Sequence, residues 1–462
     1  MADANSSSHV VVVSSPGVGH ITPFVELTKL LVFHHNFTAT LITFLDLPCP
    51  LPSSISVVQL PLQELPTDTD ISVRVALNMA NSVSPLRQIL ISLQRTTRIA
   101  AVILDIFGIE FYSMVKELHI RRYLFLTTNL FFLSFLHHLP TLDETTTGEF
   151  RDMPEPLKLP GCVPLKGVDF LATLQERKSV AGVMAVHGAR KYDNVEGILV
   201  NSFEALEAGA AKFLKQTSGG KPPVWPIGPL TASDSDMWSE DQSHDCIEWL
   251  NQQPSGSVIF ICFGSAGTLS WEQARELALG LEMSGQRFLW VVRLASETGL
   301  SGSFFNRSQI RGDPLEFLPG GFVENTKERG MVMSWAPQRQ VLGHNATGGF
   351  VSHCGWNSVL ESLVNGVPMV AWPLFAEQKM NAVFLEEGAK VALRVNVGEN
   401  GVVRREEVAK VLKELMEGEE GKQVRRGMQE MKKEAVRALG KEGSSYKTLE
   451  EVVSIFKDIA AI

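Results

Sequence analysis

The sequence GGFVSHCGWNSVLESLVNG, at residues 348–366, decides the fold class. It begins with a short apolar run typical of a buried strand, makes a tight turn at Cys354 and Gly355, and continues with a helical pattern from Trp356. A strand that leads directly into a helix is one unit of a parallel α/β sheet. The free N–H groups and the dipole of that helix start also suit an anion such as phosphate.

The same order of strand and helix recurs through both halves of the chain. We expect buried strands at 9–15, 38–44, 98–107, 121–128 and 196–203, and again at 256–265, 286–293, 330–335, 348–355 and 367–374. Alternation of strands with helical patterns predicts the α/β class, with two Rossmann-like, doubly wound parallel sheets. Ligands bind beyond the carboxyl ends of such strands, so we expect the two domains to face a shared cleft.

A change of composition near residue 230 suggests the domain boundary. KPPVWPIGPL, at 221–230, holds four prolines, and the acidic stretch TASDSDMWSEDQSHD follows it. We interpret neither as part of a packed element and expect a linker. The predicted organisation is an N-terminal domain at 1–230, a linker at 231–245 and a C-terminal domain at 246–445, with a last helix at 446–462 that packs back on the first domain. The aperiodic segment 294–322 is expected to be a long surface loop.

Composition excludes several classes of protein. The chain has 462 residues and a net charge of -9, which disfavours a nucleic-acid surface. No apolar run reaches the length of about 18 residues that spans a membrane. The N-terminus lacks the features of a signal peptide, and five scattered cysteines without CxxC spacing favour free thiols over disulfides or zinc. We therefore expect a cytoplasmic protein with no metal site.

The region from Trp335 to Gln378 concentrates polar and aromatic residues that could bind a ligand. His353, Asn357 and Ser358 surround the predicted helix start and can meet a diphosphate. Glu361 lies on the same helix face and can accept hydrogen bonds from two vicinal hydroxyls. Trp335 offers a flat surface for a base, and Glu377 and Gln378 follow a strand, where sugar hydroxyls could be bound. Each residue also has a plain structural interpretation, as a helix start or as core.

A second candidate site lies near the N-terminus. In PGVGHITP, a glycine turn leads into a helix at His20, and Asp105 ends the strand AAVILD. Histidine titrates near neutral pH and can take the proton of an acceptor hydroxyl. A buried carboxylate can hold one nitrogen of the ring and stabilise the imidazolium. The alternative is that His20 only makes a local hydrogen bond and that Asp105 only caps the next turn.

The whole set of motifs resembles the plant family 1 UDP-glycosyltransferases of secondary metabolism, which have the GT-B fold. The elements WAPQ, GGF, HCGWNS, GVP and EQ occur in the order of that family's signature. The resemblance extends over nearly the whole chain, including SSPGVGHITP and FGSAGT. HLPTLDE, MPEPLKLPGCVPL and AWPLFAEQKMNAV are most similar to the hydroquinone (arbutin synthase-like) glucosyltransferases of this family.

The resemblance implies a role for each motif residue in binding UDP-glucose. The base stacks on Trp335 and meets Ala336 and Gln338, the ribose meets Glu361, and the diphosphate meets His353, Asn357, Ser358 and Ser265. The sugar meets Trp356, Glu377, Gln378 and Thr127. Many members have Asp at the position of Glu377, a difference from which we conclude little.

The resemblance also implies the reaction and its acceptor. His20, oriented by Asp105, deprotonates a phenolic hydroxyl, which displaces UDP with inversion to a β-O-glucoside. Phe107 and Phe375 would contact the acceptor with His20, and Phe111, Phe131, Phe132 and Phe135 are either pocket walls or core. The protein would need UDP-glucose as co-substrate but no cofactor or metal, and would act as a monomer.

Other functions remain open at this stage. The acceptor could be a flavonoid, a monolignol or an indoxyl-type molecule. A nicotinamide-dependent oxidoreductase would explain the first glycine turn, but Gly17-Val-Gly19-His20-Ile21-Thr22 lacks the third glycine of GxGxxG. A UDP-sugar sensor without activity would explain the donor residues but would not need both His20 and Asp105.

Overall fold

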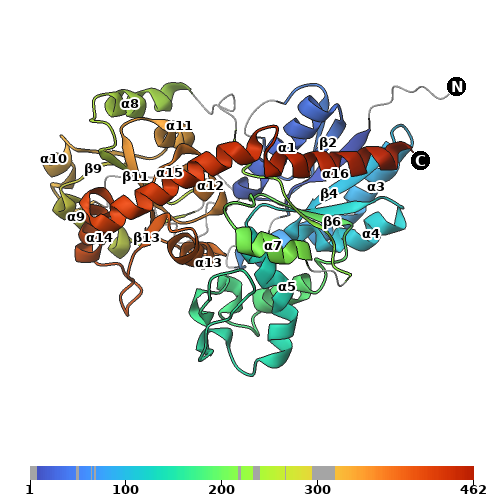
Figure 1. Cartoon of the computed structure of the whole chain (residues 1–462), viewed down its shortest axis with the longest axis horizontal. Helices are drawn as coiled ribbons and strands as arrows, with labels where there is room; N and C mark the ends of the chain where they lie inside the picture. Colours follow the sequence, from blue (N-terminus) through green and yellow to red (C-terminus); the bar gives the residue numbers. More distant parts are fainter. Residues whose placement is uncertain are drawn as a thin grey trace. The chain divides into compact units, whose positions relative to one another are not determined.

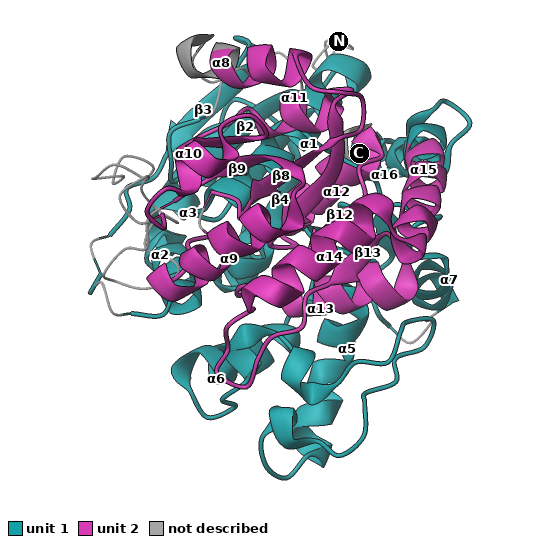
Figure 2. Ribbon diagram, turned by 90° about the vertical axis from the view of Figure 1, so that its left-hand side faces the viewer, with its two compact units in different colours: residues 1–233, 436–462 teal, residues 234–435 magenta. Residues whose placement is uncertain are grey.

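A computed structural model describes residues 8–47, 51–63, 65–66, 69–216, 220–232, 240–265, 267–293 and 318–461. The chain forms two compact units. Unit 1 comprises Met1–Ser233 and Val436–Ile462, and unit 2 comprises Asp234–Ala435 (Figure 2). Each unit contains one parallel sheet, as the alternating pattern predicts.

Unit 1 is built on a seven-stranded sheet in the order β3-β2-β1-β4-β5-β6-β7. Every neighbouring pair is parallel, and the two central strands are buried except for the first residue of β4. Burial on both faces explains the continuous apolar runs such as HVVVV. The strands are β1 (His9–Val13), β2 (Thr38–Thr43), β3 (Ile55–Gln59), β4 (Ile99–Asp105), β5 (Arg122–Leu126), β6 (Gly197–Val200) and β7 (Val224–Pro226).

Helices follow the strands of unit 1 along the chain (Figure 1). Side chains cap several of them, as at α5, where the Asn129 side chain accepts a hydrogen bond from the Phe132 N–H. The helices are α1 (Val18–His35), α2 (Ile71–Asn81), α3 (Val83–Gln94), α4 (Phe111–Glu117), α5 (Leu130–Thr145), α6 (Val180–Ala189), α7 (Ala208–Gln216) and α16 (Ser444–Ala461), with short 3₁₀ turns including η1 (Ile106–Glu110).

The last helix, α16, packs in unit 1 against strands from the start of the chain. Phe456 is fully buried and its ring lies 4.7 Å from that of Tyr123 on β5. Glu451 accepts a hydrogen bond of 3.0 Å from the indole of Trp225, and the Ser445 hydroxyl donates to the Gly228 carbonyl at 2.6 Å. A helix more than 200 positions away in sequence therefore completes the core of this sheet.

The interpretation of 221–230 as an unpacked linker was wrong. Residues Val224–Pro226 form strand β7, which pairs in parallel with β6, and Trp225 is buried. Prolines are tolerated there because β7 is an edge strand and needs hydrogen bonds on one side only. In the expected linker 231–245, residues from Glu240 onward belong to helix α8 (Glu240–Asn251), and 233–239 lie outside the described residues.

Unit 2 is built on a six-stranded parallel sheet in the order β10-β9-β8-β11-β12-β13. Its core includes Ile259, Trp290 and Val351. Most of the predicted loop 294–322 lies outside the described residues, and α10 begins at Phe322. The strands are β8 (Val258–Cys262), β9 (Arg287–Val291), β10 (Gly330–Met333), β11 (Thr347–Ser352), β12 (Met369–Ala371) and β13 (Ala392–Arg394).

The helices of unit 2 begin and end at residues suited to those positions. The Ser270 hydroxyl caps α9, which ends at Gly285 with φ 69°, a conformation that favours glycine. The helices are α8, α9 (Trp271–Ser284), α10 (Phe322–Thr326), α11 (Gln338–Gly343), α12 (Trp356–Asn365), α13 (Gln378–Val383), α14 (Arg405–Glu417) and α15 (Glu419–Leu439), which continues past the unit boundary. Within the described residues, no helix is long and apolar enough to cross a membrane.

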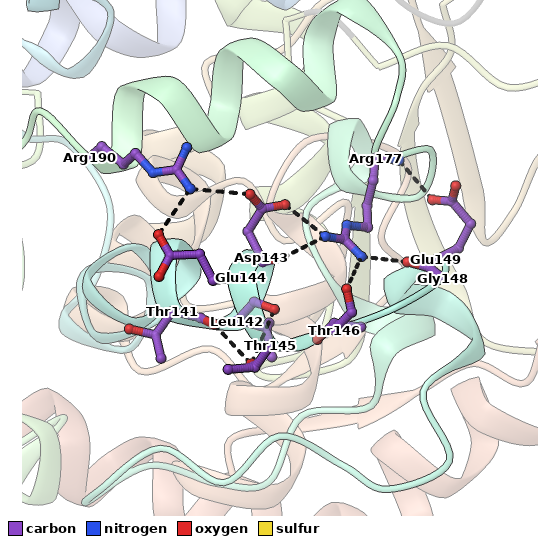
Figure 3. A network of polar contacts seen from close by, with 10 residues as sticks. All are labelled: Thr141, Leu142, Asp143, Glu144, Thr145, Thr146, Gly148, Glu149, Arg177 and Arg190. Carbon is purple, nitrogen blue, oxygen red and sulfur yellow. Dashed lines mark hydrogen bonds and ion pairs between the residues drawn. The ribbon is translucent and has the colours of Figure 1, made fainter.

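An arginine fixes the irregular segment that follows α5. The Arg177 guanidinium donates to the carbonyls of Thr146 and Gly148 and to Asp143 (Figure 3). It also lies 4.4 Å from the centre of the Phe150 ring. Arg177 precedes α6, and Arg190, directly after the last residue of α6, also contacts Asp143, at 3.4 Å. These contacts give a long stretch with little regular structure defined partners for its carbonyl groups.

A buried carboxylate supports the start of α5. Glu207 is 4% exposed and accepts hydrogen bonds from the N–H groups of Leu130 at 2.9 Å and Phe131 at 2.7 Å. The Ser202 hydroxyl donates to the same carboxylate. Burial nevertheless raises the pKa of Glu207 to about 7, against the effect of these donors.

This environment predicts a specific pH dependence of stability. The folded protein keeps the Glu207 proton up to about pH 7, whereas the unfolded chain releases it near pH 4.5. The stability that this proton contributes is therefore complete below pH 4.5 and is lost as pH rises to about 7, a change on the order of 3 kcal/mol. Thermal melting of Glu207→Gln should show a flatter decline between pH 5 and 8 than the wild type. The exposed Glu117→Gln is the control, and equal slopes for all three proteins would contradict the assignment.

Candidate active site

The strand order of unit 1 changes direction between β1 and β4. The chain continues from β1 to β2 on one side and from β4 to β5 on the other. Their carboxyl ends therefore form a topological switch point, where ligands bind in open α/β sheets. His20 follows β1 and Asp105 ends β4, so the sheet brings together two residues separated by 85 positions.

His20 and Asp105 form a directly bonded pair. The ring Nδ1 lies 2.8 Å from Asp105 Oδ2, and the Asp105 side chain is fully buried while that of His20 is 21% exposed. Asp105 Oδ1 also accepts from the Phe107 N–H at 3.1 Å. The carboxylate thus caps η1, as its plain interpretation predicts, and holds the imidazole at the same time.

The backbone at Gly17 allows this placement. Gly17 precedes α1 and has φ 145°, which a residue with a side chain rarely adopts. The turn places His20 in the first turn of α1. Phe107 is half-buried and its ring centre lies 5.6 Å from that of His20. Thr127, also half-buried, follows β5, the strand next to β4.

Four other phenylalanines near this edge lie in the core. Phe111, Phe131, Phe132 and Phe135 are at most 6% exposed. Phe135 stacks edge-on against Phe170, with ring centres 5.0 Å apart. Of the two interpretations given from the sequence, pocket wall or core, this burial agrees with core.

Unit 2 has its own switch point, between β8 and β11. The turn after β8 contains Gly264 and Ser265, and the turn after β11 contains His353, Cys354 and Gly355. Ser265 is exposed and His353 is 9% exposed. The two turns lie in contact, since a methyl group added at Gly264 would lie 2.6 Å from ring atoms Cε1 and Nε2 of His353.

His353 is held in a neutral state. A methyl group on Gly355 would approach its Nε2 to 2.4 Å, so Gly355 lies close to the ring as Gly264 does. Burial lowers the pKa of His353 to about 4. Its Nδ1 is buried and makes no hydrogen bond to any group in the described parts of the chain. Such an atom is stabilised when a ligand supplies a partner.

The helix start predicted to bind phosphate is present. α12 begins at Trp356, and the residue before it, Gly355, has no side chain that could cap the helix. Trp356 and Ser358 are buried, and Asn357 is half-buried. The conditions for an anion site, a glycine turn and a helix start, are therefore met by backbone geometry.

Gln338 connects the start of α11 to two residues of α12. Its Nε2 donates to Ser358 Oγ at 2.9 Å and to Glu361 Oε2 at 2.7 Å. Burial raises the pKa of Glu361, and the bond from Gln338 opposes that rise. Trp335, half-buried, and Ala336, buried, lie just before α11. Two residues expected to bind a base and a ribose thus contact each other directly.

The turn after β12 carries the remaining predicted residues. Gln378 is buried, and its Oε1 accepts from the N–H groups of Leu374 at 2.9 Å and Phe375 at 3.0 Å. The oxygen of this amide is committed to the backbone, so its NH₂ group is the part that can donate to a ligand. Glu377 and Phe375 are half-buried on the same turn.

Two polar residues near these sites were missed by the sequence analysis. Asn381 lies on α13, three positions beyond the motif region, and is completely buried. Arg293 follows β9, and burial lowers its pKa. Nothing in the local pattern separates either from ordinary surface residues. In the part of the chain that the structure describes, no group of acidic, histidine and cysteine side chains could hold a metal ion.

Comparison with known proteins agrees with this geometry. The family described as "UDP-glucoronosyl and UDP-glucosyl transferase" matches residues 223–433. A hydroquinone glucosyltransferase of Rauvolfia serpentina is 48% identical over 96% of this chain and 97% of its own. UDP-glycosyltransferase 72B3 of Arabidopsis thaliana is 47% identical over 98% of this chain and 96% of its own.

Solved structures show the same fold. UGT2 of Phytolacca americana, complexed with UDP-2fluoro-glucose and pterostilbene, has a TM-score of 0.88 at 45% identity, covering 98% of this chain and 100% of its own. A UDP-glucosyltransferase of Polygonum tinctorium, capable of glucosylating indoxyl, has a TM-score of 0.88 at 42% identity, covering 98% and 99%.

The chain belongs to the UDP-glycosyltransferase family and has its GT-B fold, with two parallel-sheet α/β domains. The resemblance inferred from the motifs is confirmed. The protein is a UDP-glycosyltransferase, and its donor is a UDP-sugar.

The contact between Gly264 and His353 can be tested separately from backbone conformation. Gly264 has φ 77° and Gly256 has φ 63°, but a methyl group at Gly256 would meet no atom within 4 Å. In both Gly→Ala variants the free energy of unfolding should fall by about 1 kcal/mol, because alanine is unfavourable in the left-handed conformation. In Gly264→Ala it should fall by about 2 kcal/mol more, because the methyl group clashes with His353. In thermal melting, Gly264→Ala should therefore unfold at least about 4 °C below Gly256→Ala. Equal melting temperatures would show that His353 does not pack against this turn.

Proposed function

We propose that the protein transfers glucose from UDP-glucose to the hydroxyl of a small phenolic acceptor and forms a β-O-glucoside. The observation that carries the proposal is the bond between His20 Nδ1 and the fully buried Asp105. A hydroxyl is a poor nucleophile until a base removes its proton. An imidazole held by a buried carboxylate at a strand end is suited to that task.

The proposed reaction is a single displacement. With Nδ1 bound to Asp105, Nε2 of His20 takes the proton from the acceptor oxygen. This oxygen forms a bond to the anomeric carbon while the bond to the UDP oxygen breaks, and the electron pair leaves with UDP. The configuration at the anomeric carbon is inverted. The proton goes to His20 and the electron pair of the broken bond goes to UDP, so the step needs no oxidant or reductant.

In this proposal, unit 2 binds the donor. The start of α12 and the neutral His353 stabilise the charge that develops on the departing diphosphate. Ser265, Asn357 and Ser358 add hydrogen bonds to the phosphates. Trp335 and Ala336 bind the base with Gln338, Glu361 binds the ribose hydroxyls, and Trp356, Glu377 and Gln378 bind the sugar. Thr127, which belongs to unit 1, keeps the role at the sugar that the family resemblance implies.

The acceptor proposal is supported by relatives and by ring chemistry. The relative from Rauvolfia is named for hydroquinone, and the complex from Phytolacca contains pterostilbene, both phenols. Phe107, beside His20, offers an aromatic face for a flat acceptor. We assign Phe375 to the same acceptor, and we propose a monomeric protein of the cytoplasm. A screen of UDP-glucose against a panel of phenols, flavonoids and monolignols, read by product mass, tests the assignment directly.

Removing the proposed base should separate catalysis from donor binding. His20→Ala should lower kcat/KM by about 10²-fold to 10⁴-fold, because the acceptor loses its general base. The dissociation constant of UDP, measured by calorimetry, should stay within about twofold, since the proposed donor residues are untouched. His34→Ala, at an exposed position of the same helix, is the control. If His20→Ala lost transfer and UDP binding together, the histidine would be structural.

The ribose assignment can be tested with a modified nucleotide. Glu361→Ala should weaken UDP binding about tenfold or more, since a hydrogen bond to a charged group contributes about 1.5–3 kcal/mol. The variant should also bind UDP and 2′-deoxy-UDP with nearly equal affinity, whereas the wild type should prefer UDP. A variant that keeps the wild-type preference would remove Glu361 from the ribose site.

A further inference from the structure

Asn381 links two parts of unit 2 that the proposed function uses separately. It lies on α13 and is completely buried. Its Nδ2 donates to the Cys354 carbonyl at 2.9 Å and approaches Glu377 Oε1 at 3.4 Å. An amide nitrogen has two hydrogens, and here one points to the turn before α12 and the other to a residue proposed to bind the sugar.

The turn that Asn381 contacts contains a residue, Cys354, in an unfavourable backbone conformation that other contacts must stabilise. Cys354 has φ 65°, a left-handed conformation that is unfavourable for a residue with a side chain. Its N–H donates to Ser352 Oγ at 3.1 Å, and its carbonyl accepts from Asn381. Cys354 is completely buried, so a carbonyl without this donor would be an unsatisfied polar group. The bond therefore helps fix the direction in which the chain enters α12.

The second acceptor is the side chain of Glu377. It precedes α13, and the preceding residue, Ala376, also has a positive φ of 52°. Both acceptors that face Asn381 Nδ2 are oxygens, one a carbonyl and one a carboxylate. Of the two ends of the Asn381 amide, only the NH₂ group can donate to these oxygens, so the orientation of the amide follows from its neighbours.

We propose that Asn381 is a positioning residue of the donor site, which couples the diphosphate-binding turn at Cys354 to the sugar-binding carboxylate of Glu377. The inference rests on the proposed function of these two parts. Through the Cys354 bond, Asn381 acts on every ligand that contains the diphosphate. Through the Glu377 contact, it acts only on ligands that also carry the sugar.

The proposal predicts unequal losses for two ligands. In calorimetry, Asn381→Ala should weaken UDP about threefold and UDP-glucose about tenfold or more, as expected for coupled groups. In the Glu377→Ala background, Asn381→Ala should weaken UDP-glucose no more than it weakens UDP, because the sugar-specific contact is already gone. The proposal would be overturned if Asn381→Ala weakened UDP and UDP-glucose by the same factor in the wild-type background. It would also be overturned if the double variant weakened UDP-glucose by the product of the two factors measured for the single variants.

A second variant distinguishes donation from filling of space. Asn381→Asp keeps the size of the side chain but replaces the NH₂ donor with an oxygen that faces two other oxygens. At pH 8 it should lose UDP-glucose affinity at least as strongly as Asn381→Ala. If Asn381→Asp bound UDP-glucose like the wild type, the residue would act through packing alone, and the proposal would be wrong.

Controls separate this inference from the proposed function. Asn345 is exposed and lies before β11, at the amino-terminal end of the strands and away from the turns that follow them. Asn345→Ala should therefore leave the affinities for UDP and UDP-glucose unchanged. Melting curves of all variants report whether they fold. The binding measurements need no acceptor, so the role of Asn381 can be judged even if the wild type transfers glucose to no phenol, a result that would refute the proposed function alone.

Discussion

Both units depend on one constraint, the reversal of strand order in the middle of a parallel sheet. Where neighbouring strands continue to opposite sides, the loops at their carboxyl ends separate, and side chains from distant parts of the chain meet there. In unit 1, this point brings His20 to Asp105. In unit 2, it brings Gly264 to His353. The remaining strands and helices of each unit hold the carboxyl ends of these central strands in place.

The two histidines show how environment separates the roles of one residue type. His20 is partly exposed and bonded to a buried carboxylate, an arrangement that suits proton transfer. His353 is buried among glycines, and its pKa is lowered to about 4, so it stays neutral at physiological pH and can donate a hydrogen bond without taking up a proton. In the roles proposed for them, the partly exposed His20 acts as the base and the buried, neutral His353 contacts the diphosphate.

The turns of unit 2 that are proposed to bind the donor combine residues with unusual backbone conformations and side chains that hold them in place. Glycines allow close approach at the turns, and Cys354 and Ala376 adopt positive φ without being glycine. Such conformations persist where neighbouring bonds over-determine them. Gln378 binds the backbone of its own turn, Gln338 bridges Ser358 and Glu361, and Asn381 holds the Cys354 carbonyl. The site residues are thus ordered by one another and by buried amides.

The sequence by itself determined the class of fold, most of the apolar runs that become buried strands and the residue types at the strand ends, because burial on both faces requires continuous apolar runs and a turn requires glycine. It did not indicate the edge strands β3 and β13, whose runs are short or partly exposed. It could not determine which strands become neighbours. The edge strand at Trp225 was mistaken for a linker, since its prolines signal a break locally and only its pairing with β6 shows otherwise. Likewise, only the tertiary structure decided that Asp105 holds His20, that Glu207 supports α5 and that Asn381 reaches Cys354. These contacts join residues 27 to 85 positions apart, and no local propensity encodes a hydrogen bond over that separation.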